Sequence, residues 1–257
     1  MKKFLVAIVM AAMPLVGHAA GGHVHLDHME VDLKNQASLQ RGMQTFVNYC
    51  MGCHSAQYQR FERAAVDLGM DPELVQEHLI FGDQKVGEQM TISMSKDDAG
   101  SWFGNPPPDL TLESRLRGPD WIYTYLRSFY ADDSRPWGVN NAVFKDVGMP
   151  NVLAPLQGVQ VATCSHDEMA EHGMRGQGVD PLTNLPLTSC SSIVKGTGEL
   201  SPEEFDKVVY DLVNFMAYIG EPSKLDSHRI GMYVLIFLAF FFVIAFALKK
   251  EFWKDVH

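Results

Sequence analysis

Several familiar signatures are missing from this sequence of 257 residues. It has no internal repeat, no low-complexity tract, and no linker rich in proline, glycine or serine that is long enough to divide it. We therefore expect one large domain, or a small domain with insertions, between the two chain ends. It also has no nucleophile elbow, no phosphate-binding loop and no convincing acid–base pair, which argues against bond-making catalysis by its own residues.

Basic residues are few between positions 20 and 228. That stretch holds 15 lysines and arginines against 29 acidic residues, a net charge of −14, whereas the whole chain carries −10. Such a charge argues against nucleic acid as a partner and favours a basic protein, because complementary fields speed diffusional encounter. Solubility alone is the other explanation for an acidic surface.

Cysteine is scarce, with 4 residues, yet two stand three positions apart in Cys50–His54, which reads Cys-Met-Gly-Cys-His. This CxxCH pattern is the attachment sequence for c-type haem. Two thiols on one helical turn can each form a thioether to a haem vinyl group, and the adjacent imidazole then reaches the iron. A buried thiol pair is the alternative, and a thioredoxin-like dithiol would need a βαβ context that is absent. We predict one covalent haem c on Cys50 and Cys53, with His54 as an axial ligand.

The first 20 residues are typical of a secretory signal peptide. Lys2 and Lys3 precede an apolar run at 4–16, and the small residues Gly17 and Ala19 suit a signal peptidase. Export agrees with the haem motif, because bacteria attach haem to CxxCH proteins outside the cytoplasm. We therefore predict that the mature protein begins near residue 21.

A run of 19 residues without a charge, Ile230–Leu248, predicts one membrane-spanning helix within residues 229–249. At about 1.5 Å per residue it covers roughly 28 Å, close to the hydrocarbon thickness of a bilayer. Lysines follow directly, and the positive-inside bias places residues 250–257 in the cytoplasm and the haem domain, residues 21–228, in the periplasm. A buried core helix is the alternative, but the run lacks polar residues and has basic flanks.

Three amphipathic helices are predicted in the exported part. Ser38–Cys50 delivers the cysteines to the haem. Ser201–Ile219 begins with an N-cap serine, a first-turn proline and a capping-box glutamate, and a third helix spans Pro119 to about Tyr130. Terminal helices crossed around a haem-bearing loop make the cytochrome c architecture. The predicted fold class is mainly α: a cytochrome c-like haem domain with long loops, among them 104–108 and 148–155, plus one C-terminal transmembrane helix.

An electron-carrying haem needs a second axial ligand, and methionine is the usual choice for a high potential. Met149 lies between a glycine and a proline in an irregular loop that suits the aiming of one side chain. Met216 belongs to the apolar stripe of a helix, where methionine is more often core filler. Met90 and Met94 lie close to His54 in sequence for a crossing to the distal face. We favour Met149, with the other three as alternatives.

At these residues the sequence resembles the cytochrome c1 family, the haem subunits of the cytochrome bc1 complex, a quinol:cytochrome c oxidoreductase. The resemblance covers most of the exported part. It is carried by Ser38–Gln44, with its Arg-Gly pair; by Asn105–Leu110, which reads Asn-Pro-Pro-Pro-Asp-Leu; by Val147–Pro150, with Pro155 beyond; and by Ala217–Pro222, just before the predicted span.

The resemblance implies a function and particular site residues. It supports Met149 as the ligand, places Pro107 in a Pro-Pro-Asp-Leu haem loop, and places Arg115 next to a haem propionate, although an ordinary helix-flank charge is the alternative there. It implies a redox relay from a Rieske iron–sulfur protein to a cytochrome c, beside a cytochrome b in the lipid bilayer. The chain would then be a redox subunit of a proton-translocating oxidoreductase, with catalysis by the cofactor alone.

The polar insertion Val159–Gly198 departs from the short mitochondrial form of the family. It contains Cys164 and Cys190, which in an oxidising compartment are expected to form a disulfide. The alternative is a metal site that uses both cysteines with His166 and His172. Three histidines near the mature N-terminus are expected to be exposed tail residues rather than metal ligands: His23, His25 and His28.

Two other functions remain open on the sequence. A stand-alone, membrane-tethered cytochrome c shuttle to a terminal oxidase or reductase would normally have a linker beside its anchor, and here residues 220–229 pass almost directly into the predicted span. A haem enzyme or gas sensor would leave one face of the iron open. The relay is the favoured hypothesis.

Overall fold

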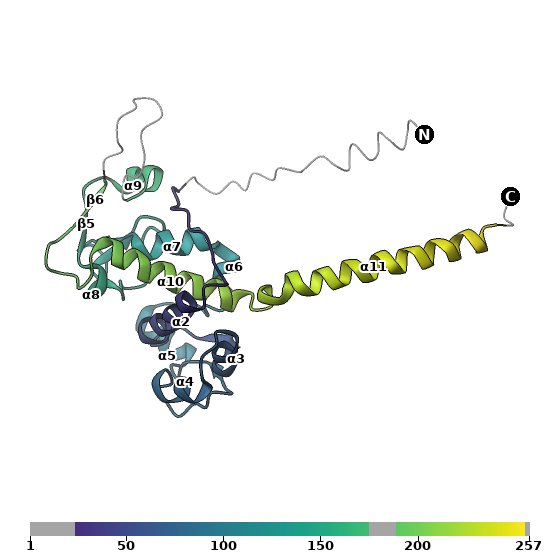
Figure 1. Cartoon of the computed structure of the whole chain (residues 1–257). Helices are drawn as coiled ribbons and strands as arrows, with labels where there is room; N and C mark the ends of the chain where they lie inside the picture. The colour runs from purple at the N-terminus through teal and green to yellow at the C-terminus, as the bar shows by residue number, and fades with distance from the viewer. Residues whose placement is uncertain (1–23, 175–188, 255–257) are drawn as a thin grey trace, which may run out of the picture.

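Helices make up most of the regular structure in residues 24–174 and 189–254, which the computed structural model describes (Figure 1). The helices are α2 Gln36–Thr45, η1 Phe46–Cys50, α3 Phe61–Asp67, α4 Pro72–His78, α5 Lys96–Phe103, α6 Glu113–Arg117, α7 Pro119–Arg127, α8 Ala154–Gln157, α9 His166–His172, α10 Pro202–Gly220 and α11 Lys224–Phe252. The strands are β1 Ala56–Arg60, β2 Gln89–Met90, β3 Phe129–Ala131, β4 Val139–Asn141, β5 Gln160–Ala162 and β6 Ser191–Ile193. The predicted signal peptide and His23 lie outside the described residues.

The crossing of α2 over α10 forms the centre of the core. Both helices are amphipathic, and their apolar stripes bury Leu39, Met43, Val209, Leu212 and Phe215 almost completely. The first helix starts at Gln36 rather than at the predicted Ser38, because the Asn35 side chain caps it by accepting from the backbone N–H of Ser38. Its last turn, η1, is a π-helical turn that ends on Cys50. The predicted crossing of terminal helices is confirmed.

The predicted capping box at the start of α10 is present. The Ser201 hydroxyl accepts from the backbone N–H of Glu204, and the Glu204 carboxylate accepts from the backbone N–H of Ser201 at 2.9 Å. Two otherwise unpaired donors are thereby satisfied at the entry of the longest helix of the domain.

The third predicted helix ends earlier than expected. The α7 helix stops at Arg127, and residues 129–131 form β3, which pairs antiparallel with β4. Phe129 and Tyr130 continue the helical spacing of apolar residues, so the sequence pattern alone extended the helix. They instead form a strand, because they pair with β4, which begins ten residues later. Periodicity within one segment carries no information about such a partner.

Two smaller units extend from this core, on opposite sides in Figure 1. One contains α3, α4 and the β1–β2 pair, and none of these elements was predicted. The other is the insertion, which folds as the antiparallel β5–β6 pair with α9. A separate small core holds the insertion against the domain; its members are Tyr130, Ala142, Met169, Met174 and Cys190.

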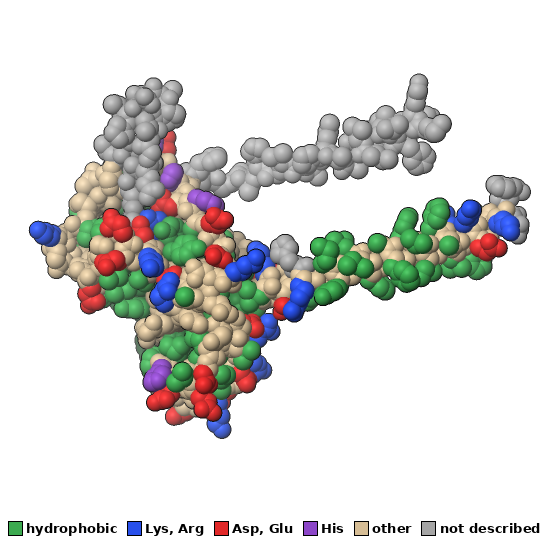
Figure 2. Space-filling view, in the orientation of Figure 1, with side chains coloured by type: hydrophobic (Ala, Val, Ile, Leu, Met, Phe, Trp, Pro, Cys, Tyr) green, Lys and Arg blue, Asp and Glu red, His purple; other side chains and the backbone are tan. Residues whose placement is uncertain are grey.

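The α11 helix stands away from the domain as a single rod (Figure 1). Its segment Arg229–Phe252 is long and apolar enough to cross a membrane, and its side chains are exposed along that length. Figure 2 shows hydrophobic side chains all along the rod and charged ones gathered at its two ends. A buried core helix is therefore excluded, because nothing in the described residues covers this segment. The membrane-anchored, mainly α architecture agrees with the predicted fold class.

Candidate haem site

A cavity of about 420 Å³ opens beside the α2–η1 helix. Its walls are mostly apolar and come from η1, the loop before α6, α6 and α7, the loop after β4, and α10. The volume and the apolar lining are typical of a cofactor site. The lining residues used below are Cys50, Cys53, His54, Pro107, Pro108, Glu113, Arg117, Trp121, Tyr125, Phe144, Met149 and Met216.

Cys50 and Cys53 are free thiols at one edge of this cavity. The turn that holds them is closed by backbone hydrogen bonds from Cys53 and His54 to the Cys50 carbonyl, at 3.1 and 2.9 Å. Burial, and then the neighbouring Cys53, raises the pKa of Cys50 to about 12. A thiol that stays protonated at neutral pH is a poor nucleophile, so Cys50 is poorly suited to disulfide exchange.

The His54 imidazole is oriented by the loop before α6. Its Nδ1–H donates to the Pro108 carbonyl at 2.7 Å, because a carbonyl can only accept, and this leaves the Nε2 lone pair for the cavity. Burial lowers the pKa of His54, although the Pro108 hydrogen bond acts in the opposite sense. The ring is therefore a neutral imidazole, the form that binds a metal.

The Pro-Pro-Asp-Leu loop is itself anchored to the segment after the cysteines. The Asp109 carboxylate accepts from the backbone N–H of Gln57 at 2.7 Å and of Thr111 at 3.0 Å. The backbone N–H of Leu110 donates to the Ser55 carbonyl at 2.8 Å. These bonds fix the carbonyl that orients the histidine, which gives the motif a physical role.

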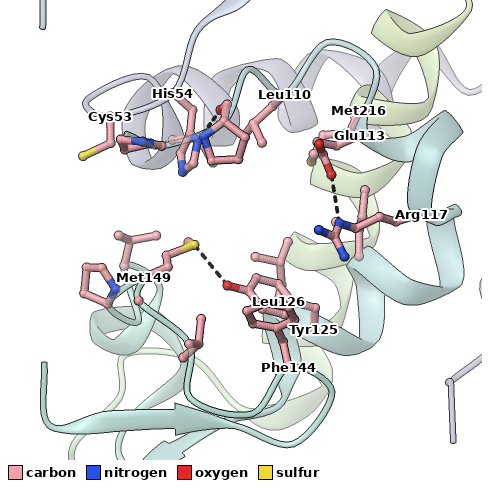
Figure 3. Close-up of a pocket in the computed structure, with 18 of the residues that line it drawn as sticks. Cys53, His54, Leu110, Glu113, Arg117, Tyr125, Leu126, Phe144, Met149 and Met216 are labelled. Carbon is pink, nitrogen blue, oxygen red and sulfur yellow. Dashed lines mark hydrogen bonds and ion pairs between the residues drawn. The ribbon is translucent and has the colours of Figure 1, made fainter. Parts of the chain in front are cut away.

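Met149 faces His54 across the cavity (Figure 3). Its loop is held on both sides of the methionine, since Val147 before it and Leu153 after it are buried. Asp146 has a positive φ of 61°, and its backbone N–H donates to the Asn140 side chain at 2.9 Å. A short polar residue tolerates this left-handed conformation, which turns the chain back towards the cavity.

An aromatic and charged stack on α6 and α7 closes a third side. The Arg117 guanidinium lies 4.4 Å from the Trp121 ring centroid and pairs with Glu113 at 3.0 Å. Trp121 stacks on Tyr125 at 4.9 Å, and the Tyr125 hydroxyl donates to the Met149 sulfur at 3.4 Å. Figure 3 shows Arg117 and Tyr125 on the same side of the cavity.

The donor set fits a haem. Two thiols lie at one edge of an apolar cavity, a neutral imidazole points into it from one face, and a thioether points in from the other. Of the basic residues, only Arg117 is in the described lining. A haem of the c type is attached by thioethers, an electron-carrying one commonly has axial nitrogen and sulfur ligands, and its propionates favour a positive neighbour; each of these has a residue here.

The comparison with known proteins decides the family. No protein-family model matches the chain. It is, however, 49% identical to cytochrome c1 of Allochromatium vinosum, over 100% of both chains. The chain belongs to the cytochrome c1 family. Cytochrome c1 of Rhodobacter capsulatus is 23% identical, over 98% of this chain and 97% of that one.

Other similar proteins carry different names. The ammonia monooxygenase gamma subunit of Nitrosomonas europaea is 41% identical over 100% of this chain and 99% of its own length. In the solved structures, a chain of a hyperthermophilic respiratory complex III matches with a TM-score of 0.45 at 15% identity, covering 99% of this chain and 97% of that chain.

As a cytochrome c1, the chain carries one covalent haem c and serves electron transport. The structure brings most of the predicted residues to one cavity: Cys50, Cys53, His54, Pro107 and Met149 all line it. Of the alternative ligands, Met216 also lines the cavity, whereas Met90 and Met94 are absent from its lining.

Arg115 lies elsewhere. Its side chain is exposed on α6 and its Cγ passes close to Gly220 of α10, whereas Arg117, two residues later, lines the cavity. Sequence reasoning missed Arg117, together with Glu113, Trp121 and Tyr125. For Trp121 and Tyr125 the missed signal was spacing, since positions four residues apart share one face of α7. Arg117 ends α6 before the break at Gly118, whose φ is 89°, so no periodicity links it to them.

The insertion contains a disulfide between Cys164 and Cys190. Those cysteines therefore offer no thiolates to a metal, and no cluster of three or more candidate ligands occurs in residues 24–174 and 189–254. His25 and His28 lie beside carboxylates, His25 3.7 Å from Asp27 and His28 3.1 Å from Asp120.

Proposed function

We propose that this chain is the haem-bearing relay of a quinol:cytochrome c oxidoreductase, taking an electron from a Rieske iron–sulfur protein and passing it to a cytochrome c. The observation that carries the proposal is the placement of His54 and Met149 on opposite faces of one apolar cavity, with Cys50 and Cys53 at its edge. Two protein ligands close both faces of an iron to small molecules, which suits electron transfer and argues against a haem enzyme or gas sensor.

Each residue has a defined task. Cys50 and Cys53 would attach the cofactor, and His54, through Nε2, and Met149, through its sulfur, would hold the iron. The bound haem supplies the one-electron redox chemistry. The protein holds the ligands on anchored segments, through the Pro108 carbonyl on one side and the turn at Asp146 on the other. Ligands that move little on reduction keep the reorganisation energy small.

The counter-charge for the propionates is assigned in the same way. Arg117 points into the cavity, held by Glu113 and by the face of Trp121, whereas Arg115 does not line it. A guanidinium fork forms strong paired hydrogen bonds with carboxylates. We therefore assign the propionate role to Arg117, and the predicted role of Arg115 is the alternative that mutation distinguishes.

The orientation in the membrane follows from charge. Lys249, Lys250 and Lys254 follow the apolar part of α11, and the positive-inside bias places them in the cytoplasm. The haem domain, residues 21–228, is then periplasmic, which agrees with the signal peptide proposed for residues 1–20. The span of residues 229–249 anchors the domain in the bacterial inner membrane, with residues 250–257 as a short tail.

The connection between α10 and α11 is short, which supports a haem domain held in a fixed position on a larger complex. Only residues 221–223 separate the end of α10 from the start of α11. A tethered shuttle needs a long flexible linker to travel between partners, and three residues allow little travel. A cytochrome b in the bilayer beside α11 is the partner we expect. The net charge of −14 between residues 20 and 228 favours a basic electron acceptor.

Purification in mild detergent tests this assignment. The tagged full-length chain is isolated from its native membrane, and the gel is stained for covalent haem. Co-purification with a b-type cytochrome and an iron–sulfur protein, together with quinol-dependent reduction of the stained band, is the expected result. Isolation as a lone haem protein would support the shuttle instead. Absence of covalent haem after acid–acetone extraction would overturn both.

A further inference from the structure

A hydrogen-bond donor from α7, the hydroxyl of Tyr125, faces the sulfur of Met149. The Tyr125 hydroxyl lies 3.4 Å from the Met149 sulfur, in the same cavity as His54 (Figure 3). A thioether sulfur has two lone pairs and is a weak acceptor. If one pair binds iron, the second is available to an O–H group on another side of the sulfur.

The Tyr125 ring has little freedom to leave this position. It stacks on Trp121 at 4.9 Å and 11°, and it meets the edge of Phe129 at 5.1 Å and 69°. The backbone carbonyl of Tyr125 accepts from the Asn141 side chain at 2.8 Å. Ring and backbone are thus fixed separately, and the hydroxyl is directed at the sulfur.

Asn141 also ties Tyr125 to the loop that carries the methionine. Its side-chain oxygen accepts from the backbone N–H groups of Val143 and Phe144, at 2.9 and 3.2 Å. One buried side chain therefore joins the last turn of α7 to the start of the ligand loop. These hydrogen bonds fix the position of α7, which carries the hydroxyl, relative to the loop that carries the sulfur.

We propose that Tyr125 is a positioning residue for the Met149 ligand, holding the sulfur in place and weakening its electron donation to the iron by donating a hydrogen bond to it. The proposal deepens the proposed function, because it rests on Met149 being the sulfur ligand. A tyrosine hydroxyl has an ordinary pKa of about 10, so at neutral pH it carries a proton and can donate.

The electron density on the sulfur decides whether the hydrogen bond raises or lowers the reduction potential. A donor on the second lone pair withdraws density from the sulfur, and a poorer sulfur donor stabilises ferric iron less. The hydrogen bond therefore raises the reduction potential, and its removal lowers it. One hydrogen bond changes an equilibrium constant by up to about tenfold. For a one-electron couple, tenfold corresponds to about 59 mV.

The test is Tyr125→Phe in the full-length, haem-loaded protein. The variant keeps the ring and its contacts with Trp121 and Phe129 and removes only the hydroxyl. Tyr123→Phe is the matched control, since Tyr123 lies on the same helix with its ring under the Arg127 guanidinium and outside the described lining of the cavity. The measurements are the reduction potential, the far-red sulfur-to-iron band, and the rate at which added imidazole displaces the methionine.

The expected result for Tyr125→Phe is a ferric–ferrous equilibrium shifted up to tenfold towards ferric, an altered far-red band, and displacement by imidazole that is several times faster. Tyr123→Phe should match the parent in all three. Unchanged values in Tyr125→Phe, or a change in melting temperature alone, would overturn the proposal, because a residue that only packs does not tune the ligand. Met149→Leu is measured in parallel. A far-red band that survives in that variant would refute the ligand assignment itself, which is a separate failure.

Discussion

Arg41 of α2 donates from Nε to Oδ2 of Asp211 on α10 at 2.6 Å, directly beside the point where the two helices touch. The adjacent Gly42 lies so close to α10 that a Cβ built on it would overlap the Asp211 carbonyl oxygen and lie 2.7 Å from the Phe215 Cβ. The Arg-Gly pair of the sequence is therefore a contact motif. The glycine permits the approach, and the arginine pairs with the buried carboxylate that the approach brings near.

The first prediction concerns this contact. Gly42→Ala places a methyl group where backbone already lies, so α2 and α10 must separate, and we expect a loss of about 3 kcal/mol of unfolding free energy. Gly100→Ala is the control, because a Cβ there meets nothing within 4 Å in the middle of α5. That variant should be stabilised by about 0.5 to 1 kcal/mol. Denaturant unfolding of both variants checks the pair, and equal stabilities would contradict the close approach.

A second prediction tests the ligand. Met149→Leu replaces the thioether by a branched alkyl group of similar volume, so the far-red sulfur-to-iron band should vanish and the potential should fall while covalent haem stays attached. Met90→Leu, at a fully buried site outside the described cavity lining, should leave the spectrum unchanged. Visible absorption and redox titration decide the outcome. A band lost on changing Met216 instead would identify that residue as the ligand.

Arg117 and Arg115 make a matched pair for a third prediction. Arg117→Gln removes a positive charge from the cavity wall, and a cation near the iron disfavours the ferric state, so the potential should fall. Arg115→Gln, on the same short helix but outside the described lining of the cavity, should change it little. If redox titrations show a larger fall in potential for Arg115→Gln than for Arg117→Gln, Arg115 is the propionate partner, as the sequence predicted.

The disulfide leads to a fourth prediction. Cys164 and Cys190 are 26 residues apart, and closing a loop of that length stabilises the folded state by about 3 to 4 kcal/mol in the chain-entropy model. Replacing both by serine should lower the free energy of unfolding by that amount, and the urea midpoint should fall with it. Reductant should lower the midpoint of the parent protein and leave the serine variant unchanged. A parent protein that is insensitive to reductant would show that the bridge contributes nothing.

The capping box of α10 predicts a pH dependence. The backbone N–H of Ser201, and then its hydroxyl, hold the pKa of Glu204 below its ordinary value of 4.5. A carboxylate with a lowered folded pKa stabilises the protein above the ordinary value, and that contribution is lost as the pH falls through the folded value. Glu204→Ala should therefore be less stable than the parent protein near pH 7, with the difference shrinking below about pH 4. Denaturant unfolding between pH 7 and pH 3 measures this difference, and a difference that does not change with pH would contradict the role of the charged carboxylate.

Much of this protein can be predicted from local sequence signals. The spacing Cys-x-x-Cys-His fixes the chemistry of the haem, because thioether attachment needs two thiols on one turn and a neighbouring imidazole. An uncharged run of 19 residues specifies a span through its length alone, and Ser-Pro-x-Glu specifies the start of α10. These features depend on residues close together in the chain.

What only the tertiary structure decided depends on residues that are distant in the chain. Phe129 and Tyr130 continue a helical pattern, yet pairing with β4 makes them a strand. Arg115 and Arg117 are equally plausible in sequence, and only the packing of α6 in the fold decides between them: Arg117 lines the cavity, whereas Arg115 lies beside Gly220 of α10. The Tyr125 hydroxyl meets the Met149 sulfur across 24 residues of chain. No periodicity encodes such a meeting, because it is set by how α7 and the ligand loop are held against each other.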